Sequence, residues 1–118
     1  MRIQRFEDIV AWQKAIKLAE LIYQTFLYSK DFGFKDQIQR AVISTSNNIA
    51  EGFERNTNRE LKNFLFIAKG SCGEVRSMAY IAKKLNYIDE EKLSIIVKQS
   101  TEISKMLSGF IKKLNDLS

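Results

Sequence analysis

Four segments of the sequence place apolar residues at alternating intervals of three and four positions, and this spacing constrains the fold more than any other feature. Such spacing lines up apolar side chains along one side of a helix. The chain also has 118 residues, no proline and five glycines, so little interrupts a helix. The four apolar stripes are Ile9, Trp12, Ile16, Ala19, Tyr23 and Phe26; Ile38, Val42, Thr45, Ile49 and Phe53; Leu61, Leu65, Ala68, Cys72, Val75, Ala79 and Ala82; and Leu93, Ile96, Ser100, Ile103, Leu107, Phe110, Leu114 and Leu117.

Short polar stretches separate the four stripes. The first is SKDFGF at residues 29–34. Thr57 and Glu60 have the spacing of a capping box at the start of the third helix. Asp89 suits the N-cap of the fourth helix, with Ile88 placed to contact Leu93 across it. We therefore predict an all-α fold, an antiparallel up-down-up-down four-helix bundle that forms one domain over residues 1–118.

The composition excludes several classes of function. Histidine is absent, so neither a Ser-His-Asp site nor a Glu-x-x-His metal site can be built. The single cysteine, Cys72, lies on the third apolar stripe, where a buried inert thiol is expected rather than a reactive one. No apolar run approaches the ~20 residues of a membrane span. We expect a cytoplasmic, non-enzymatic protein without a metal or cofactor.

The second segment carries a polar face made of residues that form helices poorly. Arg40, Ser44, Asn48, Glu51 and Arg55 share the side opposite its apolar stripe. Serine and asparagine are unusual on an exposed helix face, but their short side chains let another backbone approach closely. Glu51 and Arg55 are four residues apart and can form an ion pair. The face is either solvated or a packed contact surface, and we favour the contact surface.

The third segment has a second face, and two glycines lie within it. This face consists of Phe66, Gly70, Gly73, Ser77 and Tyr80. Each mid-helix glycine costs about 1 kcal/mol relative to alanine. One interpretation is a turn at KGSCGE that divides the helix; the other is close contact with another helix. Because the apolar spacing continues across both glycines, we predict a continuous helix whose second face meets another subunit.

The positive charge of the chain is concentrated in the third segment. Residues 57–87 hold six basic and two acidic side chains, whereas residues 1–56 sum to +1 and residues 88–118 sum to zero. Four of these cations recur every seven positions: Lys62, Lys69, Arg76 and Lys83. Such a line can meet nucleic-acid phosphates, with Tyr80 nearby to stack on a base. The alternative is a solvated face whose long aliphatic stems cover apolar edges.

Three motifs in order carry a resemblance to a known family. The first is F-x-D-I-x-A-W-Q-K-A at residues 6–15. The second is R-A-x-x-S-x-x-x-N-I-A-E-G at residues 40–52, followed by Arg55. The third is F-L-x-I-A-x-G-S at residues 64–71, followed by L-x-Y-I at residues 85–88. Over nearly its whole length the sequence resembles the small "four helix bundle protein" family, some members of which are encoded in intervening sequences of bacterial 23S ribosomal RNA genes. Two positions depart from the family pattern: Ser46 stands where proline is usual, and Gln39 where an arginine is usual.

The resemblance implies a non-enzymatic protein that forms a ring. Members of the family are similar to the accessory protein of diversity-generating retroelements, a pentameric ring that binds nucleic acid and a reverse transcriptase. The ribosomal connection concerns gene location only. Two functions stay open: a homo-oligomer, such as a pentamer, that binds RNA or DNA through the basic line, and a scaffold that docks a protein partner, for example a reverse transcriptase, through the polar face of the second helix.

Overall fold

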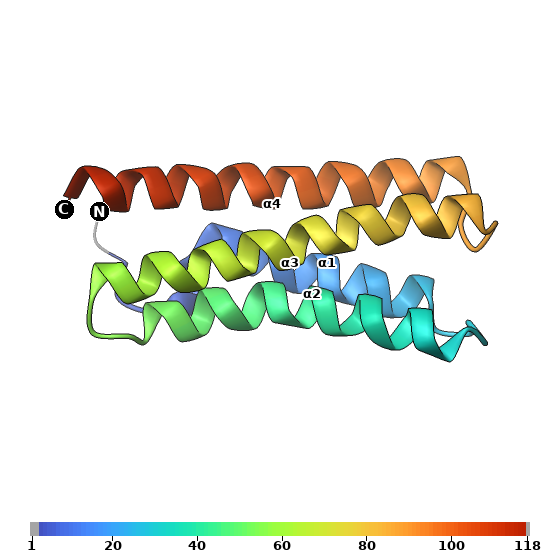
Figure 1. The fold of residues 1–118 in the computed structure, drawn as a ribbon, viewed down its shortest axis with the longest axis horizontal. Coiled ribbons are helices and arrows are strands. Elements are labelled where there is room, and N and C mark those ends of the chain that lie inside the picture. Colours follow the sequence, from blue (N-terminus) through green and yellow to red (C-terminus); the bar gives the residue numbers. More distant parts are fainter. Residues whose placement is uncertain (1–2, 118) are drawn as a thin grey trace.

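The computed structural model describes residues 3–117, and within them the chain forms four long helices and no strand. They are α1 (Val10–Thr25), α2 (Phe32–Phe53), α3 (Asn58–Lys84) and α4 (Glu90–Leu117). A short 3-10 turn, η1 (Phe6–Asp8), precedes α1. The predicted all-α fold is therefore confirmed (Figure 1).

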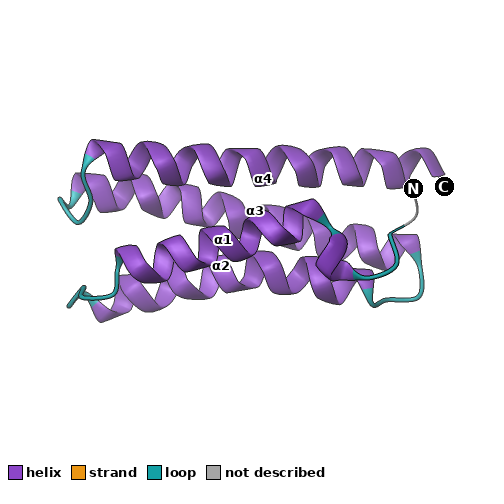
Figure 2. Cartoon of the chain, turned by 180° about the vertical axis from the view of Figure 1, so that it is seen from behind, coloured by secondary structure: helices purple, strands orange, loops and turns teal. Residues whose placement is uncertain are grey.

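The helices run up, down, up and down, as Figures 1 and 2 show. Each packs on its neighbours in the chain, α1 also packs on α4, and the most extensive contact is between α2 and α3. The bundle measures 46 by 21 by 19 Å. The α2–α3 connection lies at one end of it, and the α1–α2 and α3–α4 connections lie at the other. Within residues 3–117, no helix combines the length and the apolar character that crossing a bilayer requires.

Side-chain caps determine where three helices begin. The Thr57 hydroxyl accepts from the Glu60 amide at 3.1 Å, and the Asp89 carboxylate accepts from the Lys92 amide at 2.8 Å, so both predicted caps are confirmed. Asp31 caps α2 in the same way, because it accepts from the Phe34 amide. The break expected at residues 29–34 lies instead at residues 26–31, because α1 ends at Thr25 and α2 begins at Phe32.

The apolar stripe predicted for α1 was partly wrong. Ile16 and Tyr23 are 43% and 41% exposed. Ile9, Ala19 and Phe26 of the predicted stripe are buried, as expected. The core also receives a neighbouring stripe with the same three-and-four spacing: Ala11, Ala15, Leu18 and Ile22. Trp12 is half-buried and packs edge-on against Phe6, with ring centroids 5.2 Å apart. Two stripes of helical spacing overlap on α1, and the core receives residues from both.

The other three stripes agree with the prediction except at the end of α4. In α2 and α3 the predicted residues are buried, apart from Phe53, which packs partly buried against the core. In α4 the stripe holds as far as Leu107 and then continues through Ile111 to Leu114. Phe110, like Phe53, packs partly buried against the core, whereas Leu117 is 69% exposed, so the assignment of Leu117 was wrong. Leu117 lies at the very end of the bundle, where no further helix turn covers it.

Candidate nucleic-acid interface

The four cations predicted to bind nucleic acid lie on one uninterrupted helix. α3 continues through Gly70 and Gly73 without a break, so the prediction of a continuous helix is confirmed and the turn interpretation is wrong. With a rise of 1.5 Å per residue, successive members of the line stand about 10 Å apart along the axis, and the whole line spans about 30 Å. The line, here called the α3 basic line, consists of Lys62, Lys69, Arg76 and Lys83.

The α3 basic line lies on the side of α3 that faces α4. Lys62 Nζ donates to Asn115 Oδ1 of α4 at 2.9 Å. All four side chains are half-buried, so their stems lie against the bundle, as the alternative interpretation expects. Within residues 3–117, however, none of the four forms an ion pair. Their positive charges are therefore not neutralised by a carboxylate of the described chain.

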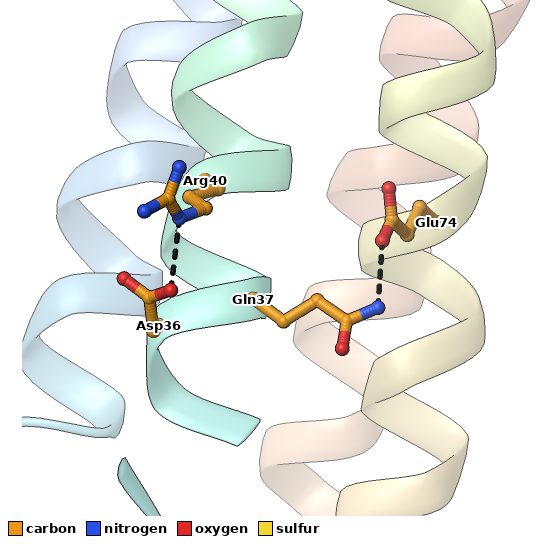
Figure 3. A network of polar contacts seen from close by, with 4 residues as sticks. All are labelled: Asp36, Gln37, Arg40 and Glu74. Atoms are coloured by element: carbon orange, nitrogen blue, oxygen red, sulfur yellow. Dashed lines mark hydrogen bonds and ion pairs between the residues drawn. The ribbon is translucent and has the colours of Figure 1, made fainter. Parts of the chain in front are cut away.

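The two acidic residues of α3 are occupied elsewhere. Glu60 belongs to the cap at the start of the helix, where its carboxylate accepts from the Thr57 hydroxyl at 3.2 Å. Glu74 points toward α2 and accepts from Gln37 Nε2 at 3.1 Å, as Figure 3 shows. Since α2 and α4 pack on different sides of α3, Glu74 lies away from the α3 basic line. Positive and negative charge are thus segregated across this helix.

The polar face predicted on α2 divides into two parts. Ser44 and Asn48 are turned inward: the Ser44 and Ser71 hydroxyls lie 2.8 Å apart, and Asn48 Nδ2 donates to the Ser44 carbonyl and hydroxyl. Arg40, Glu51 and Arg55 remain at the surface. Sequence reasoning missed Ser71 as the partner of Ser44. Both serines were visible as small residues, Ser44 in the second motif and Ser71 in the third.

The surface members of the α2 face form ion pairs with residues four positions away, and Arg55 lies just beyond the end of α2 at Phe53. The predicted Glu51–Arg55 ion pair is confirmed at 3.4 Å, and the Arg55 guanidinium also lies over the Phe64 ring at 4.8 Å. Arg40 pairs with Asp36 at 2.8 Å (Figure 3). Exposed i,i+4 pairs of this kind contribute only about 0.3–0.5 kcal/mol each. They nevertheless reduce the charge that this face presents.

The second face of α3 is left uncovered by the chain's other helices. Phe66 and Tyr80 are 52% and 51% exposed, and Ser77 is also exposed. A methyl group placed on Gly70 or Gly73 would meet no atom within 4 Å. These glycines therefore serve no close contact inside the described chain.

The described residues offer little chemistry of other kinds. No group of three or more histidine, cysteine, aspartate or glutamate residues within 3–117 is placed to hold a metal ion. The Cys72 thiol is buried, as predicted, and donates to the Ser100 carbonyl at 3.2 Å. Burial raises the pKa of this thiol to about 11, against a smaller opposing effect of the nearby Arg76 guanidinium. An inert thiol is the consequence.

Comparison with known proteins places this bundle among its relatives. The sequence profile of the 23S rRNA-intervening sequence protein family matches residues 7–109, which is most of the chain. The chain belongs to this family. The family resemblance carried by the three motifs is thereby confirmed. None of the curated proteins compared with this chain matches it.

A solved structure supports the same assignment. It is a protein of unknown function from the S23 ribosomal protein family of Bacteroides thetaiotaomicron. The two chains share 28% sequence identity and superpose with a TM-score of 0.81, over 86% of this chain and 98% of the Bacteroides chain. The relative therefore supports the fold and the family, and it brings no activity with it.

Proposed function

We propose that this protein is a non-enzymatic, homo-oligomeric bundle that binds RNA or DNA backbones through the α3 basic line, with little sequence preference. One observation carries the proposal: four cations recur on one side of a 27-residue helix, and no carboxylate of the described chain pairs with them. Such a line attracts a polyanion along its whole length. Each phosphate contact releases a condensed counterion, so the affinity depends steeply on salt.

Self-association is supported by the second face of α3. Two aromatic side chains that are half-exposed stand at either end of a strip of small residues, Gly70, Gly73 and Ser77. A second helix can approach such a strip closely while the flanking rings of Phe66 and Tyr80 become buried. We propose that this face meets another copy of the chain. Each copy would then repeat the α3 basic line, and their fields would add; a ring is the arrangement that the family resemblance implies.

The competing proposal is a scaffold that docks a protein partner through the α2 polar face. This face retains Arg40, Glu51 and Arg55 at the surface. Ser44 and Asn48, however, already have partners inside the bundle, and all three surface charges take part in ion pairs. Fewer free groups are left for a partner there than along α3, and for this reason we favour nucleic-acid binding.

The proposal is tested by replacing the α3 basic line. Fluorescence anisotropy with a labelled RNA duplex of arbitrary sequence should report binding that weakens as salt is added. The variant with Lys62, Lys69, Arg76 and Lys83 all replaced by Gln should lose this binding. A control that removes four cations elsewhere, Lys17, Lys30, Arg40 and Arg55, should retain most of it. Equal binding by the two variants, each shown to be folded by circular dichroism, would refute the role of α3.

A further inference from the structure

A second line of cations runs along α4. Lys98, Lys105 and Lys112 recur every seven positions, and all three are exposed. These three residues are here called the α4 lysine line. A sum of charge over residues 88–118 does not reveal the line, because this segment contains equal numbers of basic and acidic side chains. The structure shows why the sum misleads, because most acidic residues of this segment lie at the ends of α4, and Glu102 in its middle forms an ion pair with Lys14 of α1.

The carboxylates of α4 lie at its ends or turn toward α1. Glu90 and Glu91 occupy the first turn, where they suit the positive end of the helix dipole, and Asp116 follows at the other end. Glu102 forms an ion pair with Lys14 of α1, and this contact lowers the pKa of the Glu102 carboxyl, with a smaller effect of Lys98 in the same direction. Within residues 3–117, no member of the α4 lysine line forms an ion pair, although Lys98 and Lys112 each stand four residues before a carboxylate, that of Glu102 or Asp116. The lysine ammonium groups are therefore not held by a carboxylate and can contact a ligand.

Two contacts fix how α4 lies against α3. Lys62 contacts Asn115, and Cys72 contacts the Ser100 carbonyl. Because the two helices are antiparallel, these pairs place the middle of the α4 lysine line at about the same height along the bundle as the middle of the α3 basic line. Three half-buried residues that carry hydroxyl groups follow the same helical stripe as Asn115, which faces α3. These residues, here called the α4 hydroxyl strip, lie between the two lines of cations; they are Thr101, Ser104 and Ser108.

We propose that α4 supplies the second half of the nucleic-acid interface, in which the α4 lysine line and the α3 basic line flank the α4 hydroxyl strip. Packed helices stand about 8–10 Å apart, a distance that long lysine and arginine side chains bridge, so one phosphate backbone contacts cations of both. Serine and threonine hydroxyls are common phosphate donors in such interfaces. This inference rests on the proposed function and extends its site from four cations to seven.

The number of cations sets the salt dependence of binding. For duplex binding, the slope of log affinity against log salt is about −0.9 for each neutralised phosphate. Seven contacts give a slope of about −6, and four give about −3.6. Raising salt from about 50 to about 200 mM should then weaken binding several-thousand-fold with both lines and roughly 150-fold with the α3 basic line alone.

The test compares two triple variants of the full chain with the same RNA duplex. Replacing Lys98, Lys105 and Lys112 by Gln should reduce the magnitude of the slope by about 2.7. The matched control replaces Lys30, Arg40 and Arg55 by Gln; it removes the same charge from α2 and the connections beside it, and should leave the slope near the wild-type value. A slope for the α4 variant that equals the control's would overturn the inference.

The outcomes separate this inference from the proposed function. If the wild type does not bind the duplex at low salt, the proposed function fails. If the wild type binds, the α3 variant does not, and the α4 variant matches its control, only the role of α4 fails. Displacement of the RNA by poly-glutamate at equal charge concentration would mean that both lines attract any polyanion, and would overturn a site for nucleic acid.

Discussion

Replacing Gly52 with alanine should destabilise the bundle although alanine is the better helix former. Gly52 lies in the last turn of α2, where a methyl group would stand 2.7 Å from Phe64 Cβ and 3.3 Å from the Leu61 carbonyl oxygen of α3. Neither atom is the far end of a flexible side chain, so the backbones of α2 and α3 must move apart. Overpacking of this kind costs about 1–3 kcal/mol, whereas the gain in helix propensity is at most about 1 kcal/mol. We expect a net loss of about 1–2 kcal/mol in the free energy of unfolding.

Urea unfolding followed by circular dichroism at one fixed protein concentration measures this change. The matched control is Gly109→Ala in α4, where a methyl group would meet no atom within 4 Å. The control should gain up to about 1 kcal/mol, and both variants should keep the wild-type m-value. A Gly52→Ala variant as stable as the control would refute the close approach of α2 and α3 at this position.

Two further predictions concern α3. Gly70→Ala and Gly73→Ala should each raise the free energy of unfolding of the isolated chain by up to about 1 kcal/mol, because the methyl group fits. If the second face of α3 packs on another copy, the same changes should lower the mass measured by light scattering. Cys72 should react with a thiol reagent near neutral pH roughly 100-fold more slowly in the native protein than in urea, because its pKa of about 11 leaves little thiolate; equal rates would mean that the thiol is accessible.

The sequence was sufficient to predict the helices because local rules agree with one another along most of the chain. The caps at Thr57 and Asp89 come directly before apolar stripes that are buried. The capping residues and the apolar spacing therefore indicate the same two helices. The prediction for α1 was partly wrong because this helix carries two overlapping apolar stripes. Both stripes follow the helical spacing, and the core takes Ile9, Ala19 and Phe26 from the predicted stripe and the residues around Ala15 from the other, while Ile16 and Tyr23 stay exposed. Only the positions of α2 and α4 decide which residues fit, and a single sequence does not contain them.

The weak helix-forming stretch of α2 has the same explanation. Ser44 and Asn48 are poor choices for a solvated helix, and sequence reasoning treated their face as a contact surface without identifying what it contacts. The structure supplies a contact with α3 of the same chain: a serine pair joins the helices at Ser44 and Ser71, and Gly52 lets Phe64 approach. Residues that lower the intrinsic stability of one helix thus allow the most extensive helix contact of the bundle.

The candidate interface was only half predictable, because charge was summed by segment rather than placed by helix face. α3 has an excess of cations, so a sum finds its basic line. The segment 88–118 has none, since five carboxylates balance its five lysines in the count, although one of these carboxylates, that of Glu102, pairs with Lys14 of α1. The period of seven in the α4 lysine line was visible in the sequence, but its meaning depends on the contact of Lys62 with Asn115. That contact turns two separate helical patterns into neighbouring lines, and the slope of log affinity against log salt therefore tests whether cations of both helices contact one ligand.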